Sequence, residues 1–456
     1  MRIVIVGDGK IGSNLAEQLS REGHAITIID HLPAPLQKTS EALDILCIEG
    51  NGATADTLLE AAADTADLLI ACTASDELNL LSCLIAKKLG AKHTIARVRN
   101  PEYNSELSLI TDDLGLSMSV NPELSCASEM ARSLRYPSAI KADSFAKGHA
   151  ELLKVQVAPD SPLAGKTLIE LQKTVKVRVL ICAVERGEEV FIPTGTFRLE
   201  AGDLVSLIAS PRGAQAFFRE LHLSNNPIRQ VMIVGGGRVG FYLAKSLIDA
   251  GISVKIMEED RERCEELAER LPKAEVLCGD GTNESFLMES GLWQTDAIAV
   301  LTGIDEENIL LGAYVRSRFP KVKVLAKVNR TSYSGILGTL DFGTAYNPRD
   351  SVANLICRYA RAMQNSVGSS VETLYKLVGG KVEALEFRAV KGSAVCGVTL
   401  RDLQLKEKLL IGCINRNGKI LIPSGQDCIE PGDTVIVVTS VTGLNDLDDI
   451  LLKRKA

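Results

Sequence analysis

The chain has 456 residues, of which 46% are hydrophobic and 24% charged, and its formal net charge is −7. It is too long for one compact domain, and a composition this ordinary needs neither disulfides nor metals to hold a core. The acidic balance argues against a nucleic-acid-binding protein, because a phosphate-binding face carries clustered Lys and Arg.

The 11 cysteines include no CxxC pair, and several, such as Cys72 and Cys182, lie inside apolar runs. We interpret them as small buried hydrophobic residues in a reducing compartment. The first residues enter an apolar strand-like run at once, and no apolar run approaches the roughly 20 residues that span a bilayer. We therefore expect no targeting segment and no membrane crossing.

Short apolar runs alternate with helical segments over the first hundred residues. Strands are expected at residues 2–6, 25–29, 44–48, 68–72 and 94–98, and helices at 12–22 and 77–89. Continuously apolar strands are typical of a parallel sheet that is buried on both faces. Strands that alternate with helices predict an α/β doubly wound fold, that is, a Rossmann-like parallel sheet.

The turn after the first strand carries the pattern Gly7-x-Gly9-x-x-Gly12. In such a strand–turn–helix unit the first glycine allows the tight turn, the second lets a pyrophosphate approach, and the third lets helix and strand pack closely. The helix start then offers N–H groups to phosphate. Asp30 closes the second strand, where a carboxylate binds adenosine ribose and favours NAD over NADP.

Small and polar residues follow the later strands at the same edge of the sheet. Arg97 lies in the fifth strand, where a cation can meet phosphate. For each of these residues an ordinary loop or a helix cap competes about evenly, and Asp76 is interpreted as the N-terminal cap of the next helix. The rim residues are Asn51, Gly52, Thr73 and Ala74.

The same constellation recurs further along the chain. Gly7 to Gly12 return as Gly235 to Gly240, and Asp30 returns as Glu258. We align residues 51–54 with residues 279–282, which makes Asp280 the counterpart of Gly52, and Thr73 with Thr302. The predicted site residues are Gly7, Asp8, Gly9, Lys10, Ile11, Gly12, Asp30, Asn51, Gly52, Thr73, Ala74 and Arg97 in the first copy, and Gly235, Gly236, Gly237, Arg238, Val239, Gly240, Glu258, Gly279, Asp280 and Thr302 in the second.

A smaller unit follows each nucleotide-binding unit and also repeats. Its first copy has expected strands at residues 152–157, 179–185 and 204–209 and a short helix from 168, which predicts a mixed α+β domain. The pattern Arg186, Pro193, Gly195, Gly202, Asp203 returns as Arg416, Pro423, Gly425, Gly432, Asp433. The predicted domains are therefore 1–122 (N1), a helical linker 123–145, 146–224 (C1), 228–348 (N2), a helical linker 349–366, and 370–456 (C2).

Catalytic chemistry is not evident in the sequence. None of the 5 histidines falls in a repeated motif, and no Ser-His-Asp order, HExxH or Walker lysine motif occurs. Asp203 and Asp433 could serve as catalytic carboxylates, but Gly-Asp before a strand is more often turn chemistry. We predict a non-enzymatic binding protein without a metal site. The alternatives are an NAD-dependent oxidoreductase and a free-standing nucleotide sensor.

These motifs resemble the RCK (KTN) family, whose members regulate potassium conductance and transport. The specific elements are the two glycine turns, the acids Asp30 and Glu258, the Gly-Asp-Gly-Thr at residues 279–282, and the Thr-x-x-Asp-Glu-x-Asn runs at residues 73–79 and 302–308. The Arg186 to Asp203 pattern and its repeat add to them. With two units in one chain, the protein is similar to the cytoplasmic regulatory subunits of Trk-type potassium-uptake systems.

The resemblance implies NAD(H) as ligand, with ATP or ADP as alternatives at one or both sites. It implies a ring of eight nucleotide domains, hence a homo-tetramer, under an integral-membrane potassium channel or transporter subunit of the Trk type. The protein would lie in the cytoplasm, peripheral to the inner face of the cell membrane through this partner, and gate it by ligand-dependent conformational change. The difference between Asn51-Gly52 and Gly279-Asp280 implies that the two sites differ in ligand preference.

Overall fold

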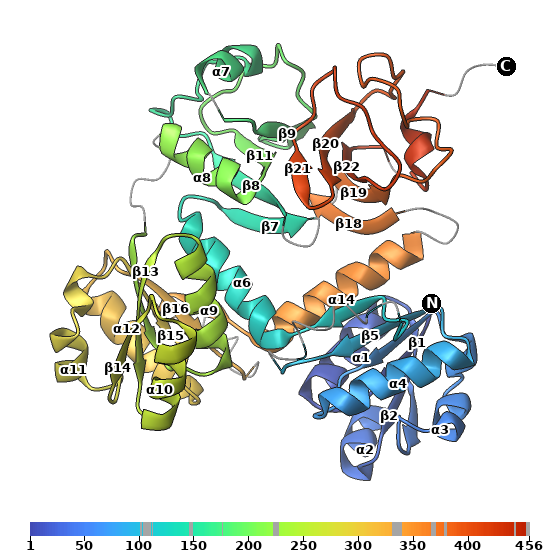
Figure 1. The fold of residues 1–456 in the computed structure, drawn as a ribbon, viewed down its shortest axis with the longest axis vertical. Coiled ribbons are helices and arrows are strands. Elements are labelled where there is room, and N and C mark those ends of the chain that lie inside the picture. Colours follow the sequence, from blue (N-terminus) through green and yellow to red (C-terminus); the bar gives the residue numbers. More distant parts are fainter. Residues whose placement is uncertain are drawn as a thin grey trace. The chain divides into compact units, whose positions relative to one another are not determined.

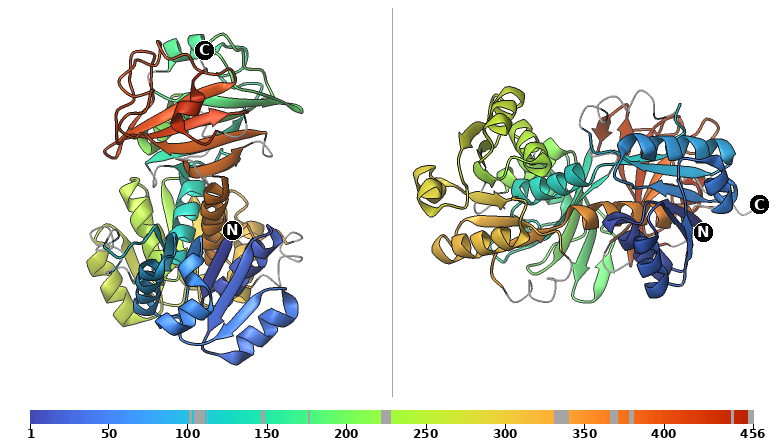
Figure 2. Two further views of the ribbon diagram at one scale, coloured as in Figure 1. Left: turned by 90° about the vertical axis from the view of Figure 1, so that its right-hand side faces the viewer. Right: turned by 90° about the horizontal axis from the view of Figure 1, so that it is seen from below.

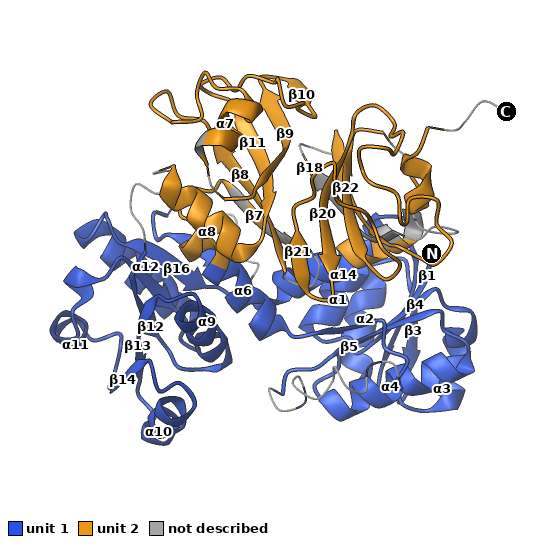
Figure 3. Cartoon of the chain, turned by 45° about the horizontal axis from the view of Figure 1, so that its top comes forward, with its two compact units in different colours: residues 1–131, 228–357 blue, residues 132–227, 358–456 orange. Residues whose placement is uncertain are grey.

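The computed structural model describes residues 1–100, 103, 111, 113–145, 149–175, 177–221, 228–330, 340–365, 371–377, 381–441 and 444–452. The chain forms two compact units, and each is assembled from two separate segments (Figure 3). Unit 1 comprises Met1–Ala131 and Ile228–Cys357, and unit 2 comprises Arg132–Pro227 and Arg358–Ala456. The two nucleotide-binding folds therefore share one unit, and the two small folds share the other.

The first segment of unit 1 is a parallel sheet with helices packed against it (Figure 1). Its strands lie in the order β3-β2-β1-β4-β5-β6, which is a doubly wound sheet whose order reverses between β1 and β4. The strands are β1 (Arg2–Val6), β2 (Ala25–Asp30), β3 (Leu46–Glu49), β4 (Leu68–Ala71), β5 (His93–Arg97) and β6 (Met118–Val120). The helices are α1 (Lys10–Arg21), α2 (Pro33–Ala42), α3 (Ala55–Glu60), η1 (Ala63–Thr65) and α4 (Asp76–Leu89).

The second segment of unit 1 repeats this sheet in the order β14-β13-β12-β15-β16-β17 (Figures 1 and 2). Its strands are β12 (Gln230–Val234), β13 (Ser253–Glu258), β14 (Glu275–Cys278), β15 (Ala297–Val300), β16 (Lys323–Lys327) and β17 (Thr344–Tyr346). Its helices are α9 (Arg238–Asp249), α10 (Arg261–Arg270), α11 (Glu284–Glu289), η3 (Leu292–Gln294) and α12 (Asp305–Arg318). The expected duplication and the α/β doubly wound class are confirmed.

Burial explains why these segments form strands and helices. Every residue of β4 and of β15 is buried, as expected for central strands covered on both faces. Helix α1 buries Ile11, Leu15 and Leu19, which are spaced by four residues and therefore lie along one face.

Two long helices follow the parallel sheets, α6 (Pro122–Arg135) and α14 (Pro348–Asn365). Each begins at a proline, which is compatible with the first helical turn because its missing N–H is not needed there. The boundary between units 1 and 2 falls inside both helices. The prediction of a helical linker over 123–145 is wrong beyond Arg135, because residues 141–145 pair with a strand of the small fold.

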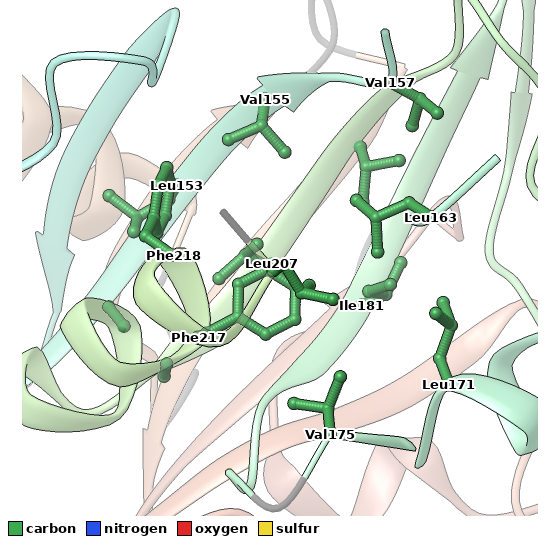
Figure 4. Packing of buried hydrophobic residues seen from close by; sticks show 14 of the residues in the cluster. Leu153, Val155, Val157, Leu163, Leu171, Val175, Ile181, Leu207, Phe217 and Phe218 are labelled. Carbon is green, nitrogen blue, oxygen red and sulfur yellow. The ribbon is translucent and has the colours of Figure 1, made fainter. Parts of the chain in front are cut away.

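The first small fold is an antiparallel sheet in the order β10-β9-β11-β8-β7. Its strands are β7 (Lys141–Phe145), β8 (Ala150–Gln156), β9 (Leu180–Arg186), β10 (Glu189–Phe191) and β11 (Leu204–Ala209), with helices α7 (Leu168–Thr174) and α8 (Pro211–Glu220). Phe217 and Phe218 of α8 pack on Leu153 and Leu207 of the sheet and close its core (Figure 4).

The second small fold has the equivalent order β18-β19-β22-β20-β21. Its strands are β18 (Val371–Leu377), β19 (Val382–Arg388), β20 (Leu409–Arg416), β21 (Lys419–Leu421) and β22 (Thr434–Thr439), and the short η6 (Leu447–Ile450) follows β22 as α8 follows β11. The two small folds share one buried cluster, which includes Cys182 and Ile208 from the first and Cys413 and Ile436 from the second. In the part of the chain that the structure describes, no helix has the length and apolar character required to cross a bilayer.

Candidate functional site

The two glycine turns adopt the conformation that their sequence predicts. Gly7 has φ of +104° and Gly235 has φ of +100°, a region that favours glycine. The N–H of Gly7 donates to the carbonyl of Ile29 at 2.7 Å, and that of Gly235 to the carbonyl of Met257 at 2.9 Å. The turn is thereby tied to the neighbouring strand β2 or β13.

The third glycine of each turn is required by packing. A Cβ at Gly12 would lie 1.8 Å from the carbonyl oxygen of Gly7, and one at Gly240 would lie 2.3 Å from that of Gly235. The second glycine is different, since a Cβ at Gly9 would meet no protein atom within 4 Å, and the backbone there has φ of −76°. Any need for glycine at this position therefore arises from something outside the chain, and pyrophosphate approach remains the prediction.

The helices that follow the turns start without a side-chain cap. Gly9 is the N-cap of α1 and Gly237 the N-cap of α9, and neither supplies a side chain to the exposed N–H groups of the first turn. Lys10 and Arg238 are exposed at these helix starts. Both Ile11 and Val239 face the core. The arrangement leaves two uncapped helix N-termini, each suited to an anion.

The acids at the ends of β2 and β13 hold the glycine turns. Asp30 Oδ2 accepts from the backbone N–H of Asp8 at 2.6 Å, and Glu258 Oε2 accepts from that of Gly236 at 2.7 Å. The second oxygen of each acid accepts from the following backbone, at Leu32 N for Asp30. Each carboxylate is therefore held against its glycine turn, and its contact with ribose stays a prediction.

Asp8 makes the two sites chemically different. Its side chain is buried at 5% exposure, and neither carboxylate oxygen makes a hydrogen bond of normal geometry. Burial raises the pKa of Asp8, the nearby Thr39 hydroxyl lowers it, and the Asp30 carboxylate raises it further. The second copy has Gly236 here, where a Cβ would lie 2.4 Å from Leu267. Sequence reasoning placed Asp8 in the site but did not anticipate its burial.

The structure corrects the alignment of the loops after β3 and β14. Gly50 N donates to the carbonyl of Asp30 at 2.9 Å, and Gly279 N donates to that of Glu258 at 2.8 Å, so Gly50 and Gly279 are counterparts. Asn51 therefore corresponds to Asp280, and each side-chain oxygen accepts from the backbone N–H two residues later. The prediction that paired Asp280 with Gly52 is wrong by one residue.

The physical reason is an additional residue in one turn. Three residues separate α2 from β3, whereas four separate α10 from β14. The next glycines support the corrected register, because a Cβ at Gly52 would lie 2.1 Å from Val6 and one at Gly281 would lie 2.7 Å from Val234. In this loop the two sites therefore differ by an amide, Asn51, against a carboxylate, Asp280.

A buried asparagine joins the end of β4 to the end of β5 in the first copy, and the end of β15 to the end of β16 in the second. Asn79 is 0% exposed, and its Oδ1 accepts from Thr73 N at 2.8 Å and from Thr73 Oγ1 at 2.7 Å. Its Nδ2 donates to the carbonyl of Arg97 at 2.9 Å. Asn308 makes the equivalent bonds with Thr302 and Lys327. This clamp fixes Thr73 and Thr302 at the rim, and Ala74 beside Thr73 is exposed.

A half-buried cation lies behind this rim in each copy. Arg97 Nη1 donates to the carbonyl of Thr73 at 2.6 Å, and Lys327 Nζ donates to that of Leu301 at 3.0 Å. Desolvation lowers the pKa of both groups. Sequence reasoning missed Lys327, although its position relative to the repeated Asn308 would have revealed it. Both cations stabilise the carbonyl end of the fourth strand, and a phosphate contact by Arg97 stays a prediction.

Asp76 is not the helix cap that the sequence suggested. The N-cap of α4 is Ser75, whose side chain accepts from Leu78 N. Asp76 instead accepts at 2.8 Å from the backbone N–H groups of both Arg99 and Asn100. The side chain of Arg99 in turn donates to Glu123 at 2.8 Å in the first turn of α6. In this way the rim of the first site is linked to a linker helix.

The repeated acids of the small folds are structural. Asp203 receives two hydrogen bonds at 2.8 Å from Arg186 and one from Glu200 N. Asp433 is held in the same way by Arg416. Both therefore have the turn role that the sequence favoured over catalysis. Among the described residues, no three His, Cys, Asp or Glu side chains are grouped as a metal site would require.

Hydrogen bonds also cross between the two copies within unit 1. Asn14 Nδ2 of α1 donates to Asp350 Oδ1 of α14 at 3.1 Å. Asn121 Nδ2, next to α6, lies 3.3 Å from the hydroxyl of Tyr242 in α9. Helix α1 of the first copy thus contacts the linker helix that follows the second copy, and α9 of the second copy contacts the residue that precedes the first linker helix.

Family models match the chain in the same repeated pattern. The TrkA-N domain matches residues 3–122 and 231–348, and the TrkA-C domain matches residues 152–222 and 384–452. Fold and sites therefore define a tandem nucleotide-binding protein with two Rossmann-like units and two small α+β units.

Related proteins extend over the whole length of the chain. It is 33% identical to "Trk system potassium uptake protein TrkA homolog" of Archaeoglobus fulgidus over 451 residues, covering 99% of this chain and 100% of the relative. It is 31% identical to "Trk system potassium uptake protein TrkA" of Vibrio alginolyticus, covering 96% of this chain and 95% of the relative. The chain belongs to the TrkA family.

Solved structures share the fold. The GsuK channel matches with a TM-score of 0.62 at 19% identity, covering 96% of this chain and 76% of the channel chain. The GsuK RCK domain matches with a TM-score of 0.60 at 20% identity, covering 96% of this chain and 92% of that chain. The resemblance to the RCK family that the sequence indicated is confirmed.

Proposed function

We propose that the chain is the nucleotide-binding regulatory subunit of a Trk-type potassium transporter and is not an enzyme. The observation that carries the proposal is the duplicated glycine turn, with an uncapped helix start on one side and a carboxylate on the other. The TrkA relatives are named as potassium-uptake proteins. A channel with the same fold is described as bound to NAD.

The proposed ligand at each site is NAD(H) or an adenine nucleotide. The phosphates would lie at the start of α1 or α9, where backbone N–H groups and the helix dipole favour an anion. The ribose hydroxyls would reach Asp30 or Glu258. Both acids already accept hydrogen bonds from the glycine turn, so they are held in place before a ligand arrives.

The protein would act as a tetramer at the cytoplasmic face of its membrane partner. Leu81 of α4 is 47% exposed and Leu310 of α12 is 70% exposed, and they occupy the same position in the two copies. A single exposed leucine is ordinary on a protein surface, so we propose this repeated position only as the place where subunit contact is tested.

Gating requires a ligand that binds one conformation better than another. The test is potassium flux through proteoliposomes that contain the Trk-type membrane subunit and this chain, with NADH, NAD, ATP or ADP added in turn. Nucleotide-dependent flux that is lost in Gly9→Ala or Gly237→Ala supports the proposal. Flux that ignores every nucleotide, although calorimetry detects binding, would contradict it.

The rival function is an NAD-dependent oxidoreductase, since the same fold serves dehydrogenases. Incubation of the pure protein with NADH and carbonyl substrates, followed by nicotinamide absorbance, separates the two. Sustained oxidation of NADH that depends on the added carbonyl would favour the enzyme.

A further inference from the structure

Two cysteines lie together at the ribose end of the second site. Cys264 is in α10 and is 7% exposed, whereas Cys278 ends β14 and is exposed. Their thiol groups are in side-chain contact. Cys264 Sγ donates to the carbonyl of Glu258 at 3.3 Å, and Cys278 Sγ lies 3.9 Å from that of Glu259. The pair therefore sits on the turn that presents the Glu258 carboxylate.

We propose that Cys264 and Cys278 form an oxidisable dithiol that controls nucleotide binding at the second site. The control of binding rests on the proposed function, whereas the thiol chemistry does not. A disulfide requires a sulfur–sulfur separation of about 2 Å. Because the side chains of Cys264 in α10 and Cys278 in β14 are already in contact, a modest rotation of each brings the two sulfurs to bonding distance.

The reaction uses a peroxide as the oxidant. The Cys278 thiolate attacks hydrogen peroxide to give a sulfenic acid and hydroxide, which takes up a proton to become water. The sulfur of Cys264 then attacks the sulfenic sulfur, a disulfide forms, and a second water leaves. Two thiols and one peroxide thus become one disulfide and two waters.

The order of the two steps follows from exposure. Cys278 meets solvent and is the thiol that an oxidant reaches first. Burial, and then the neighbouring Cys278, raise the pKa of Cys264 to about 11. Cys264 is thus both shielded from solvent and mostly protonated, so it reacts second, as the resolving partner, after losing its proton to water when it attacks the sulfenic sulfur.

Oxidation would change the turn because both sulfurs lose their hydrogen. The carbonyls of Glu258 and Glu259 would then lose their S–H contacts. The same turn supplies the N–H groups of Glu259 and Asp260, which donate to Glu258 Oε1. A displaced turn misplaces the carboxylate, so we expect weaker nucleotide binding at the second site.

The first site has no such pair. The residue that corresponds to Cys264 is Leu36 in α2, and the strand partner equivalent to Cys278 is Glu49, which pairs with Asp30 as Cys278 pairs with Glu258. Redox control would therefore act on one nucleotide site of the chain and spare the other, which serves as an internal control.

The thiol chemistry is tested on the full-length protein, purified with reductant and then treated with hydrogen peroxide. Digestion without reductant should yield a peptide pair linked through Cys264 and Cys278 that has lost two hydrogen atoms. Phenylarsine oxide, which bridges two adjacent thiols, should bind the native chain and fail to bind Cys278→Ser. Cys428→Ser, at a half-exposed cysteine of unit 2, is the matched control and should retain both products. Absence of the linked peptide together with absence of the arsenical adduct would overturn the proposal.

The effect on binding is measured by calorimetry with NADH and ATP in a Gly9→Ala background. This background removes binding at the first site, so that the measured affinity is that of the second. We expect a several-fold weaker affinity after oxidation, restored by reductant and absent from Cys278→Ser. A linked peptide with unchanged affinity would overturn the control of binding. If the reduced protein binds neither nucleotide, the proposed function fails, while the linked peptide still decides the thiol chemistry.

Discussion

Replacement of Gly9 by alanine should remove nucleotide binding from the first site without unfolding it. The added methyl group would meet no protein atom within 4 Å, and the backbone φ of −76° is ordinary for alanine. Lower entropy of the unfolded chain favours the variant by about 0.4–1 kcal/mol, while the loss of glycine at the N-cap opposes it by about 0.5–1 kcal/mol. We therefore expect the free energy of unfolding to change by less than about 1 kcal/mol.

Replacement of Gly12 by alanine is the matched control, because it should lower the stability of the fold, whereas replacement of Gly9 should leave it almost unchanged. Its Cβ would lie 1.8 Å from the carbonyl oxygen of Gly7, in a backbone contact that no side-chain rotation relieves. Helix α1 would have to move away from the turn, and overpacking of this kind costs about 1–3 kcal/mol or more. Gly12→Ala should thus destabilise the fold and lose binding as a consequence.

The assay combines urea denaturation with calorimetry of NADH, using the Gly237→Ala background so that the first site is measured alone. In Gly9→Ala we expect a loss of about 2–3 kcal/mol, roughly a hundredfold in Kd, because a methyl group keeps the phosphate from the backbone N–H groups. Binding of NADH to Gly9→Ala with unchanged affinity would refute the assignment of this turn as a phosphate site.

Three further predictions follow from the same sites. Asp30→Ala should weaken NAD binding by about 1–3 kcal/mol in calorimetry, and an unchanged affinity would remove Asp30 from the site. Since the folded-state pKa of Asp8 is raised, the stability linked to its protonation is present at low pH and lost as pH rises. Asp8→Asn should therefore raise the unfolding free energy near pH 7 and leave it almost unchanged near pH 4; an equal gain at both would contradict this. Light scattering should give a mass near four protomers for the purified chain and a smaller one for Leu310→Asp, whereas a stable monomer of the parent chain would exclude the ring.

The glycine turns and the parallel sheets were predictable from the sequence because their signals are local. A turn with φ near +104° at Gly7 needs glycine, and a strand covered on both faces is apolar at every residue. The helix at the start of each linker was predicted as well. The strand at residues 141–145 was not, because its formation depends on β8, which follows it in the chain.

The errors at the sites arose where contacts over long sequence distances decide the outcome. The pairing of Asn51 with Asp280 follows from the backbone hydrogen bonds that Gly50 and Gly279 make with the ends of β2 and β13. An alignment of the two sequence copies does not reveal those bonds. Asp76 resembles a helix cap by position, but its partners Arg99 and Asn100 are more than 20 residues away. The side chain of Asp8 meets the Thr39 hydroxyl of α2, a contact between residues about 30 positions apart in the chain.

The hydrogen bonds around Asp76 connect the rim of the first site to the start of α6. The rim of the first site, the backbone of Arg99 and the first turn of this helix are joined through Glu123, so that the start of α6 cannot rotate independently of the rim. The helix has 14 residues and is therefore about 21 Å long. A tilt of about 5° at its start would carry its far end, at Arg135 in unit 2, by about 2 Å. If a bound nucleotide displaces this rim, α6 is therefore the element through which the displacement would leave the first site.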